Sequence, residues 1–443
     1  MTNKIMGTIR RLAILSLMPI ASALHTAAQE PEFDAELVLP FQDEHVHGST
    51  IEQLPNGDLL VAWFQGGGER WADDVRIMGA RKKSGSDNWS DPFILADVDA
   101  FPDINPVLFV DGQDRLWLLW YTVIANQWST SLLKYRTSED YLSMQGAPNW
   151  DWQADLHVKP GGKTERGILP DDPFVESVER QLEAYGSSLD DQNSERFEQW
   201  KERILSRARG EDMMREGRIY REDGTYEERE LGYPYFRRMG WQTRAKPFLT
   251  ESGRMIIPLY SDGFSFSLMA YTDDGGETWQ FSEPLVGAGN IQPAIAETES
   301  GDLVTYMRDN GPPPKRLHVS KSTDDGETWS IASDSELPNP GSAADIVTLE
   351  NGNWVLIYND TERGRHSLAV ALSEDDGETW PWKRKIEMDD SENPRTGGYP
   401  AIIQGQDGNL LTTYSYRVPN EDATGQRKTV KYTTFNEAWI KAE

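Results

Sequence analysis

Short apolar segments recur along the chain in pairs, and each pair is joined by a turn that contains glycine. Six copies of this unit turn at Gly57, Gly112, Gly253, Gly301, Gly352 and Gly408. Apolar runs of this length, bounded by turn residues, are typical of antiparallel β-hairpins. Six similar units, each completed to four strands and closed in a ring, make an all-β protein with the architecture of a six-bladed β-propeller. The pattern predicts this fold for residues 29–443.

The spacing of the turns is interrupted once. Successive glycines lie 55, 141, 48, 51 and 56 residues apart, so one interval holds about 90 extra residues between 137 and 240. Apolar residues recur there at helical spacing, as Val175, Val178, Leu182 and Tyr185 and then as Phe197, Trp200, Ile204 and Leu205. We expect 137–240 to be a helical excursion inserted in the propeller. It is either a lid over one face of the ring or a solvated decoration.

A second repeat has the pattern Ser/Thr-x-Asp-x-Gly-x-Thr-Trp. Three intact copies span 272–279, 322–329 and 373–380, and a worn copy lies at 82–89. In such a turn the Asp carboxylate accepts backbone N–H groups, glycine supplies positive φ and the indole packs between neighbouring sheets. These Asp boxes are therefore predicted to be structural turns.

The first 28 residues have the character of a targeting segment. Lys4, Arg10 and Arg11 precede an apolar run at 12–23, and small residues follow at 26–28. This order is typical of a secretory signal peptide. A membrane anchor is the alternative, but the run is about 12 residues and a spanning helix needs about 20. We expect a periplasmic or secreted protein with no membrane span in its mature chain.

Charge and composition narrow the range of partners. The chain carries 73 acidic and 44 basic residues, for a net charge of -29, and it has no cysteine. Such a surface repels phosphate backbones, so nucleic-acid binding is disfavoured. The absence of cysteine excludes disulfides, thiolate metal sites and cysteine nucleophiles. An anionic ligand needs a local basic pocket.

The hairpin register predicts where such a pocket lies. If every turn glycine lies at one end of the ring, the residues that begin the inner strands and those that end the next strands converge at the opposite end. The first set is His47, Asn105, Lys246, Gln292, Asp345 and Tyr399. The second set is Phe64, Trp120, Tyr260, Arg308, Asn359 and Ser415. A polar, partly cationic funnel with aromatic walls is the expected ligand site.

Loops near this end add further charge. Acidic residues are Asp73 and Asp74, and basic residues are Arg237, Arg238, Arg244, Lys315, Arg316, Arg363 and Arg365. Because arginine binds carboxylates in a bidentate manner, this set favours an anionic substrate. The alternative is that the arginines pair with aspartates and brace the loops.

The Asp boxes, the spacing of the blades and the site register together resemble the sialidase (neuraminidase) superfamily. The resemblance implies a carboxylate-binding role for Arg308 in YMRDNG and for Arg365 in RGRHSL, and a nucleophilic role for Tyr399 in GGYPAII. It also implies that Asp73 or Asp74 is the acid/base. The chain departs from the family pattern twice. His47-Gly48-Ser49 replaces Arg-Ile-Pro in the first blade, and Gln292 lies where the Glu partner of the tyrosine is expected.

Three functions remain open at this stage. The first is an exo-glycosidase acting on acidic or deoxy sugars, in which Tyr399 attacks the anomeric centre and Asp73 or Asp74 is the acid. The second is a lyase for uronic-acid polysaccharides, in which His47 and Tyr399 act as base and acid. The third is a propeller that binds glycans without turning them over. His45 and His47 lie on one face of an extended segment, but two histidines do not define a metal site, and no metal or cofactor is predicted.

Overall fold

Six antiparallel sheets form most of the described chain. The computed structural model describes residues 29–160, 167–169, 172–189, 191–221, 223–420 and 425–442. The predicted signal peptide lies outside the described residues. In the order of their strands, the first two sheets are β2 (His45–Gln53), β3 (Leu59–Gly66), β4 (Arg76–Lys82) and β5 (Phe93–Ala96), and β6 (Asp103–Val110), β7 (Leu116–Val123), β8 (Ser131–Ser138) and β9 (Trp152–Asp155).

The remaining four sheets follow in chain order. The third consists of β12 (Trp241–Thr243), β13 (Phe248–Leu249), β14 (Met255–Ser261), β15 (Phe266–Thr272) and β16 (Gln280–Phe281). The fourth and fifth are β17 (Asn290–Glu297), β18 (Leu303–Asp309), β19 (Arg316–Ser322) and β20 (Ser333–Pro338), and β21 (Asp345–Thr348), β22 (Trp354–Tyr358), β23 (Ser367–Ser373) and β24 (Trp382–Met388). The sixth is β25 (Thr396–Gln404), β26 (Leu410–Pro419), β27 (Gln426–Phe435) and β1 (Phe33–Leu37).

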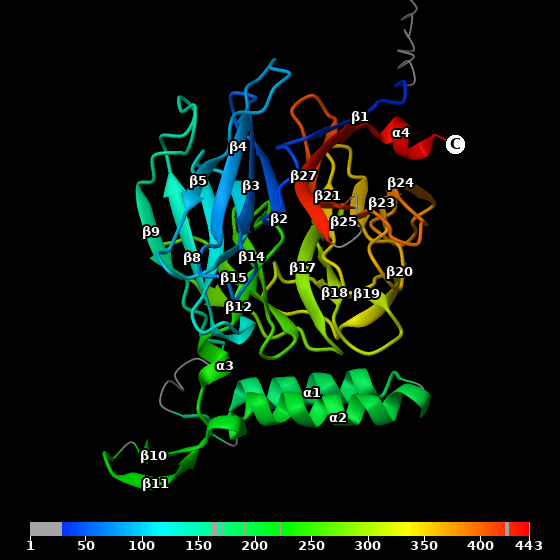
Figure 1. The fold of residues 1–443 in the computed structure, drawn as a ribbon. Coiled ribbons are helices and arrows are strands. Elements are labelled where there is room, and N and C mark those ends of the chain that lie inside the picture. The colour runs from blue at the N-terminus through cyan, green and yellow to red at the C-terminus, as the bar shows by residue number, and fades with distance from the viewer. Residues whose placement is uncertain are drawn as a thin grey trace, which may run out of the picture.

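The sheets lie next to one another in chain order, and the order returns to its start. The inner strand β2 contacts β6 on one side and β25 on the other, while β17 contacts β14 and β21. The strand β1 from the N-terminal part of the chain pairs with β27 near the C-terminus, with Phe33 opposite Phe435 (Figure 1). The prediction of an all-β architecture is confirmed.

The six predicted turns each join the first strand of a sheet to the second. Five of the glycines have positive φ, between 82° and 89°, the left-handed region that a side chain makes unfavourable. Gly112 is the exception, because Asp114 takes the left-handed conformation in that turn, with φ 58°.

The Asp boxes are turns between the third and fourth strands of three sheets. In one of them, Asp324 accepts hydrogen bonds from the backbone N–H of Thr328 at 2.9 Å and from the hydroxyls of Thr328 and Ser322 at 2.5 and 2.8 Å. The same bonds recur at Asp274 and Asp375. The carboxylates of the boxes are thus engaged in the turns, as the repeat predicts.

Two long helices lie within 137–240. The helices are α1 (Pro173–Gly186) and α2 (Asp191–Ala208), and the shorter elements of the segment are η2 (Glu211–Met213), β10 (Arg215–Tyr220), β11 (Tyr226–Leu231) and α3 (Tyr235–Arg238). Two further short helices are η1 (Trp128–Thr130) and α4 (Glu437–Lys441). The first part of 137–240, through Asp155, belongs to the second sheet, where β9 pairs with β8. Among the described residues, none of the helices has the length and apolar character needed to cross a membrane.

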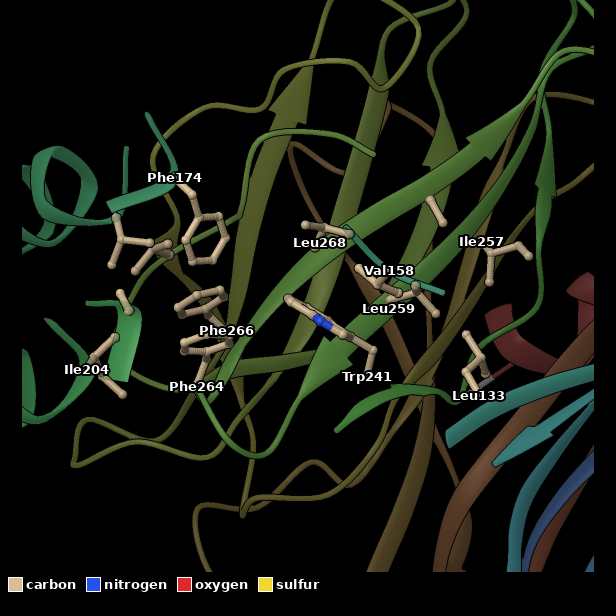
Figure 2. Packing of buried hydrophobic residues seen from close by; sticks show 14 of the residues in the cluster. Leu133, Val158, Phe174, Ile204, Trp241, Ile257, Leu259, Phe264, Phe266 and Leu268 are labelled. Carbon is tan, nitrogen blue, oxygen red and sulfur yellow. The ribbon is translucent and has the colours of Figure 1, made fainter. Parts of the chain in front are cut away.

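The helix pair packs on the third sheet and does not stand apart in solvent. Phe174 of α1 and Ile204 of α2 lie in one buried cluster with Trp241, Phe264 and Phe266 (Figure 2). In Figure 1, α1 and α2 run side by side beneath the sheets, and the hairpin of β10 and β11 projects away from them. The turn that carries Phe264 joins β14 to β15, so the helices support a loop at the end of the sheets opposite the turn glycines.

Candidate functional site

A cavity of about 380 Å³ lies where the inner strands begin. Its lining residues are His47, Phe64, Glu69, Ile104, Asn105, Tyr121, Trp128, Tyr260, Asp262, Gln292, Arg308, Asn310, Arg365, Tyr399 and Arg417. Strands of five of the six sheets contribute to this lining, and the fifth sheet contributes Arg365 from the loop between β22 and β23. The expected convergence of strand ends is therefore present in the structure.

Bulges in the inner strands aim several of these side chains at the cavity. The pairing register shifts at Asn105, Gln292 and Tyr399, and each of these residues has a φ between 48° and 56°. A non-glycine residue rarely adopts this conformation, and such strain is concentrated at functional sites. A proline follows each of the three residues, and proline within a sheet is confined to edges and bulges. Gly48 occupies the corresponding bulge in β2, with φ 64°.

Tyr399 lies among cationic groups. Its hydroxyl accepts a hydrogen bond of 2.7 Å from Nη1 of Arg308. The guanidinium carbons of Arg365 and Arg244 lie 5.0 and 5.4 Å from the centre of its ring. Burial raises the pKa of the phenol, but the charges of Arg308 and Arg365 outweigh this effect and hold the pKa below its ordinary value. The phenolate form of Tyr399 is thus more stable, relative to the phenol, than it is for a tyrosine in water.

Three arginines line the cavity, and the third was not predicted. Arg308 also donates to Oε1 of Gln292 and to Oδ1 of Asn310, both at 3.3 Å, and Arg365 donates to the carbonyl of Gly341 at 3.1 Å. Arg417 comes from the end of β26, and burial lowers its pKa, as does its neighbour Arg365. Within the described part of the chain, no carboxylate lies within 4 Å of any of the three guanidinium groups. A cluster of half-buried arginines without carboxylate partners favours an anionic ligand.

His47 lies beside Tyr399 and is buried, with 5% of its surface exposed. Its Nδ1 is 2.7 Å from the hydroxyl of Ser415, and its ring centre is 4.2 Å from that of Tyr399. Burial, together with the charge of Arg417 and other nearby cationic groups, places its pKa well below the ordinary value of 6.5. At neutral pH this imidazole is uncharged, so it does not add to the positive charge of the cavity.

Two carboxylates reach the cavity, and neither is Asp73 or Asp74. Those two aspartates are exposed on the loop after β3, where Asp74 accepts the backbone N–H of Gly67 at 3.0 Å. From the same loop Glu69 lines the cavity, with Oε1 3.2 Å from Nε2 of His45. Burial raises the pKa of Glu69, but the adjacent imidazole of His45 and the charges of Arg417 and Arg70 outweigh this effect and lower the pKa.

The second carboxylate is Asp262, from the turn between β14 and β15. Burial raises its pKa, and the charge of Arg308 opposes the rise without cancelling it. The two carboxylates of the cavity are thus shifted in opposite directions. A pair of titratable groups with separated pKa values is a common basis for dividing acid and base roles.

Several predicted site residues serve the framework. Lys246 forms an ion pair of 2.5 Å with Glu52 and, together with Asp345, lines a separate cavity of about 160 Å³ between inner strands. Burial raises the pKa of Asp345 to about 6. Arg244 is buried under Tyr399 and donates to the carbonyl of Pro400 at 2.8 Å. These residues support the floor of the site and do not line it.

The loop residues also brace the structure. Asn359 donates to the carbonyls of Ser367 and Gly397 at 2.7 and 2.8 Å. Lys315 pairs with Asp309 at 3.0 Å, and Arg316 pairs with Glu362 at 2.6 Å. Lys315 and Arg316 therefore pair with acidic residues and brace their loops, as the alternative interpretation of the basic residues expects.

The chain spacing contained a signal for three of the cavity residues that the sequence analysis does not predict. Asp262, Asn310 and Arg417 each lie nine positions after a turn glycine, two beyond the predicted positions. Alternate residues of a strand point to the same face, so the wall of the cavity continues through them. Glu69 had no such signal, because it lies on a loop. No group of three or more potential metal ligands occurs among the described residues.

Comparison with known proteins agrees with the fold and the repeat. The model of the BNR repeat-like domain matches residues 57–168 and 216–411, and the chain belongs to this family, within the sialidase-like BNR/Asp-box superfamily. A sialidase of Bacteroides fragilis is 27% identical over 132 residues, which cover 28% of this chain and 24% of that protein. An anhydrosialidase of Macrobdella decora is 35% identical over 125 residues, which cover 28% of this chain and 15% of that protein. The matched region thus spans a quarter or less of these curated relatives.

Solved structures of sialidases share the propeller-like fold. The intramolecular trans-sialidase of Ruminococcus gnavus has a TM-score of 0.54 at 15% identity, with 90% of this chain and 96% of that chain covered. A protein of unknown function from Dyadobacter fermentans has a TM-score of 0.60 at 13% identity, with coverage of 91% and 97%. At these identities the likeness concerns the fold alone.

Proposed function

We propose that this protein is a six-bladed propeller enzyme, exported to the periplasm or the exterior, that removes an acidic or deoxy sugar from the end of a glycan. The observation that carries the proposal is the hydroxyl of Tyr399, which is 2.7 Å from Arg308 inside a cavity that also holds Arg365 and Arg417. The matches to sialidases support a glycosidase of this class.

The arginines define the binding step. Three guanidinium groups without carboxylate partners line the cavity, and each can donate two N–H groups to a bound carboxylate. A volume of about 380 Å³ accommodates a single sugar ring with its substituents. The enzyme therefore acts on a terminal sugar, and the rest of the glycan remains outside the cavity.

The remaining groups suit cleavage of a glycosidic bond. Tyr399, with its lowered pKa, attacks or stabilises the anomeric carbon as the bond to the leaving oxygen breaks. Asp262, whose raised pKa favours the protonated form, gives its proton to that oxygen. Glu69, which is held ionised, then takes a proton from the water that attacks the anomeric carbon, and the bond from that carbon to the oxygen of Tyr399 breaks. This assignment replaces Asp73 and Asp74 as the acid/base.

A uronic-acid lyase is the second candidate, and the uncharged His47 favours it. Among the described residues no carboxylate is hydrogen-bonded to the hydroxyl of Tyr399, whereas the imidazole of His47 lies against its ring. In this reaction the arginines neutralise the uronate, His47 takes the proton from C5, and Tyr399 protonates the leaving oxygen. The C5–H and C4–O bonds break, and a C4–C5 double bond forms.

One assay separates the candidates. The purified mature protein is incubated with a panel of acidic oligosaccharides, and product mass and ultraviolet absorbance are measured. Two products whose masses add up to that of the substrate plus one water indicate hydrolysis. Two products whose masses add up to that of the substrate alone, one of them unsaturated and absorbing, indicate elimination. If the protein binds an oligosaccharide but forms neither product, it is a glycan-binding propeller and the proposal is wrong.

A further inference from the structure

A tryptophan lies exposed on the rim of the cavity. Trp71 belongs to the loop between β3 and β4 and has 61% of its surface exposed. Two residues earlier on the same loop, Glu69 lines the cavity. Indole exposed to this extent leaves one apolar face in contact with water. Single exposed apolar residues are common, so its support and its position decide its meaning.

The indole rests on a rigid support. The guanidinium of Arg70 lies 4.9 Å from the centre of the Trp71 ring and 5.1 Å from that of Trp128, so it makes a cation–π contact with each indole. Nε of Arg70 donates to the carbonyl of Asn126 at 3.2 Å, and the amide of Asn126 donates back to the carbonyl of Arg70 at 2.9 Å. These reciprocal bonds fix the loop of Trp71 to the loop before β8.

The same stack reaches into the site. Trp128, on the inner side of Arg70, lines the cavity. The charge of Arg70 also acts on the two cavity carboxylates, Glu69 and Asp262. A line from Trp128 through Arg70 to Trp71 therefore runs from the wall of the cavity outward over its rim, beside the carboxylates that the proposed reaction uses.

We infer that Trp71, supported by Arg70 and Trp128, forms a subsite for a neutral hexopyranose, the sugar to which the acidic residue is attached. This inference rests on the proposed function in one respect, the order of the two sugars. Because the cavity holds a single ring, the next sugar of the glycan leaves over the rim. The C–H face of a hexopyranose packs well on a flat indole, whose fixed orientation lowers the entropic cost of binding.

The charges around the stack explain why the sugar is neutral. The guanidinium of Arg70 lies close to two indole rings and has a backbone carbonyl at its Nε. The ionised carboxylate of Glu69 lies close by and repels a second anionic sugar. The surface offered to a ligand is thus apolar, and the subsite selects for a glycan with its acidic group only at the end.

Binding of neutral disaccharides tests the subsite without any turnover. Lactose and cellobiose are added at millimolar concentration to the mature protein, and saturation-transfer NMR is recorded for the wild type, Trp71→Ala, Trp71→Phe and Trp152→Ala. Trp152, on β9, is 60% exposed and is the matched control. We expect at least a fivefold loss of transfer in Trp71→Ala, partial retention in Trp71→Phe and no change in Trp152→Ala. Equal transfer in the wild type and Trp71→Ala overturns the inference, as does no transfer from either sugar to the wild type.

Turnover gives the second arm. Two substrates are compared: an acidic oligosaccharide that the wild type cleaves, and the methyl glycoside of the same acidic sugar, which lacks the neutral sugar. Trp71→Ala is expected to lower kcat/KM at least tenfold on the oligosaccharide and less than twofold on the methyl glycoside. Equal losses on both substrates would contradict a subsite for the leaving sugar. If neither substrate is cleaved, the proposed function fails, while the NMR result still decides whether a neutral sugar binds at Trp71.

Discussion

At the scale of single residues, opposing effects set the protonation of the site. Burial alone raises the pKa of a phenol or a carboxyl, and nearby arginines lower it. For Tyr399 the arginines prevail, whereas for Asp262 burial prevails. For His47, burial and cationic neighbours act in the same direction and keep the imidazole neutral. The cavity therefore combines a fixed positive wall with groups poised for proton transfer.

Replacement of Arg417 tests whether the unpredicted arginine binds substrate. Arg417→Ala is expected to cost about 2–4 kcal/mol in kcat/KM on an acidic substrate, because a desolvated charge-assisted bond is lost. Arg417→Lys keeps the charge but cannot donate two parallel N–H groups, so it should recover part of the lost kcat/KM. Arg316→Ala is the control, since Arg316 pairs with Glu362 away from the cavity, and we expect no change in kcat/KM. Full activity of Arg417→Ala would exclude a carboxylate contact.

The pH dependence of turnover tests Asp262 as the acid. A general acid works in its protonated form, so kcat/KM should fall as pH rises through the raised pKa of Asp262. Asp262→Asn should remove this basic limb and slow substrates with poor leaving groups much more than activated aryl glycosides. If the limb persists in Asp262→Asn, another residue supplies the proton.

At the scale of elements, the fold could be predicted further than the site. The turn glycines and Asp boxes are local signals, and each specifies a turn by its own residues. The strand ends that converge follow from the same register, which is why His47, Gln292, Arg308 and Tyr399 were predicted. Lys246 occupies an equivalent register position but faces a different cavity, because β12 and β13 are interrupted around it.

Loop residues could not be predicted in the same way. The sequence does not specify which of Glu69, Asp73 and Asp74 turns inward. In the structure, Glu69 is oriented by its contact with His45 on β2, and Asp74 by the N–H of Gly67 within the loop. The same holds for the docking of the helices. Their apolar stripe predicts a buried face, but the partner, the turn that carries Phe264, is recognised only in the structure.

Removal of an Asp-box carboxylate tests whether the boxes are structural. Asp324→Ala loses three hydrogen bonds within its turn and is expected to lower the free energy of unfolding by about 1–2 kcal/mol. The kcat of the variant should equal that of the wild type. Thr323→Ala, at an exposed position of the same turn, is the control for stability in urea. A large fall in kcat without loss of stability would assign the boxes a role in catalysis.

At the scale of the whole molecule, one buried histidine makes stability depend on pH. His318 is 1% exposed and lies 3.1 Å from Asp334 and 3.8 Å from Asp309. Burial lowers its pKa, but the two nearby carboxylates outweigh this and raise the pKa to about 9. Because the folded state binds the proton more tightly than the unfolded chain, this stabilisation is complete below pH 6.5 and is lost as pH rises through 9.

Chemical denaturation at several pH values tests this linkage. The unfolding free energy of the wild type should fall by about 2–3 kcal/mol between pH 6.5 and 9. His318→Gln should be less stable at pH 6.5 and should lose most of this dependence. His157→Gln, at an exposed position, should follow the wild type. Parallel curves for His318→Gln and the wild type would show that the imidazole is not charged in the folded protein.

The pairing of β1 with β27 has a consequence for the order in which the molecule assembles. Residues about 400 positions apart in the chain are neighbours there, and Phe33 stacks on Trp439 with ring centres 4.6 Å apart. The strand β1 therefore has no partner until β27, about 400 residues later, has been synthesised, and bringing the two together carries the largest loop-closure cost among the described strand pairs. Because this closure carries the largest cost, we expect unfolding to begin where β1 separates from β27. The rate at which they separate then sets the lifetime of the folded molecule in the presence of proteases.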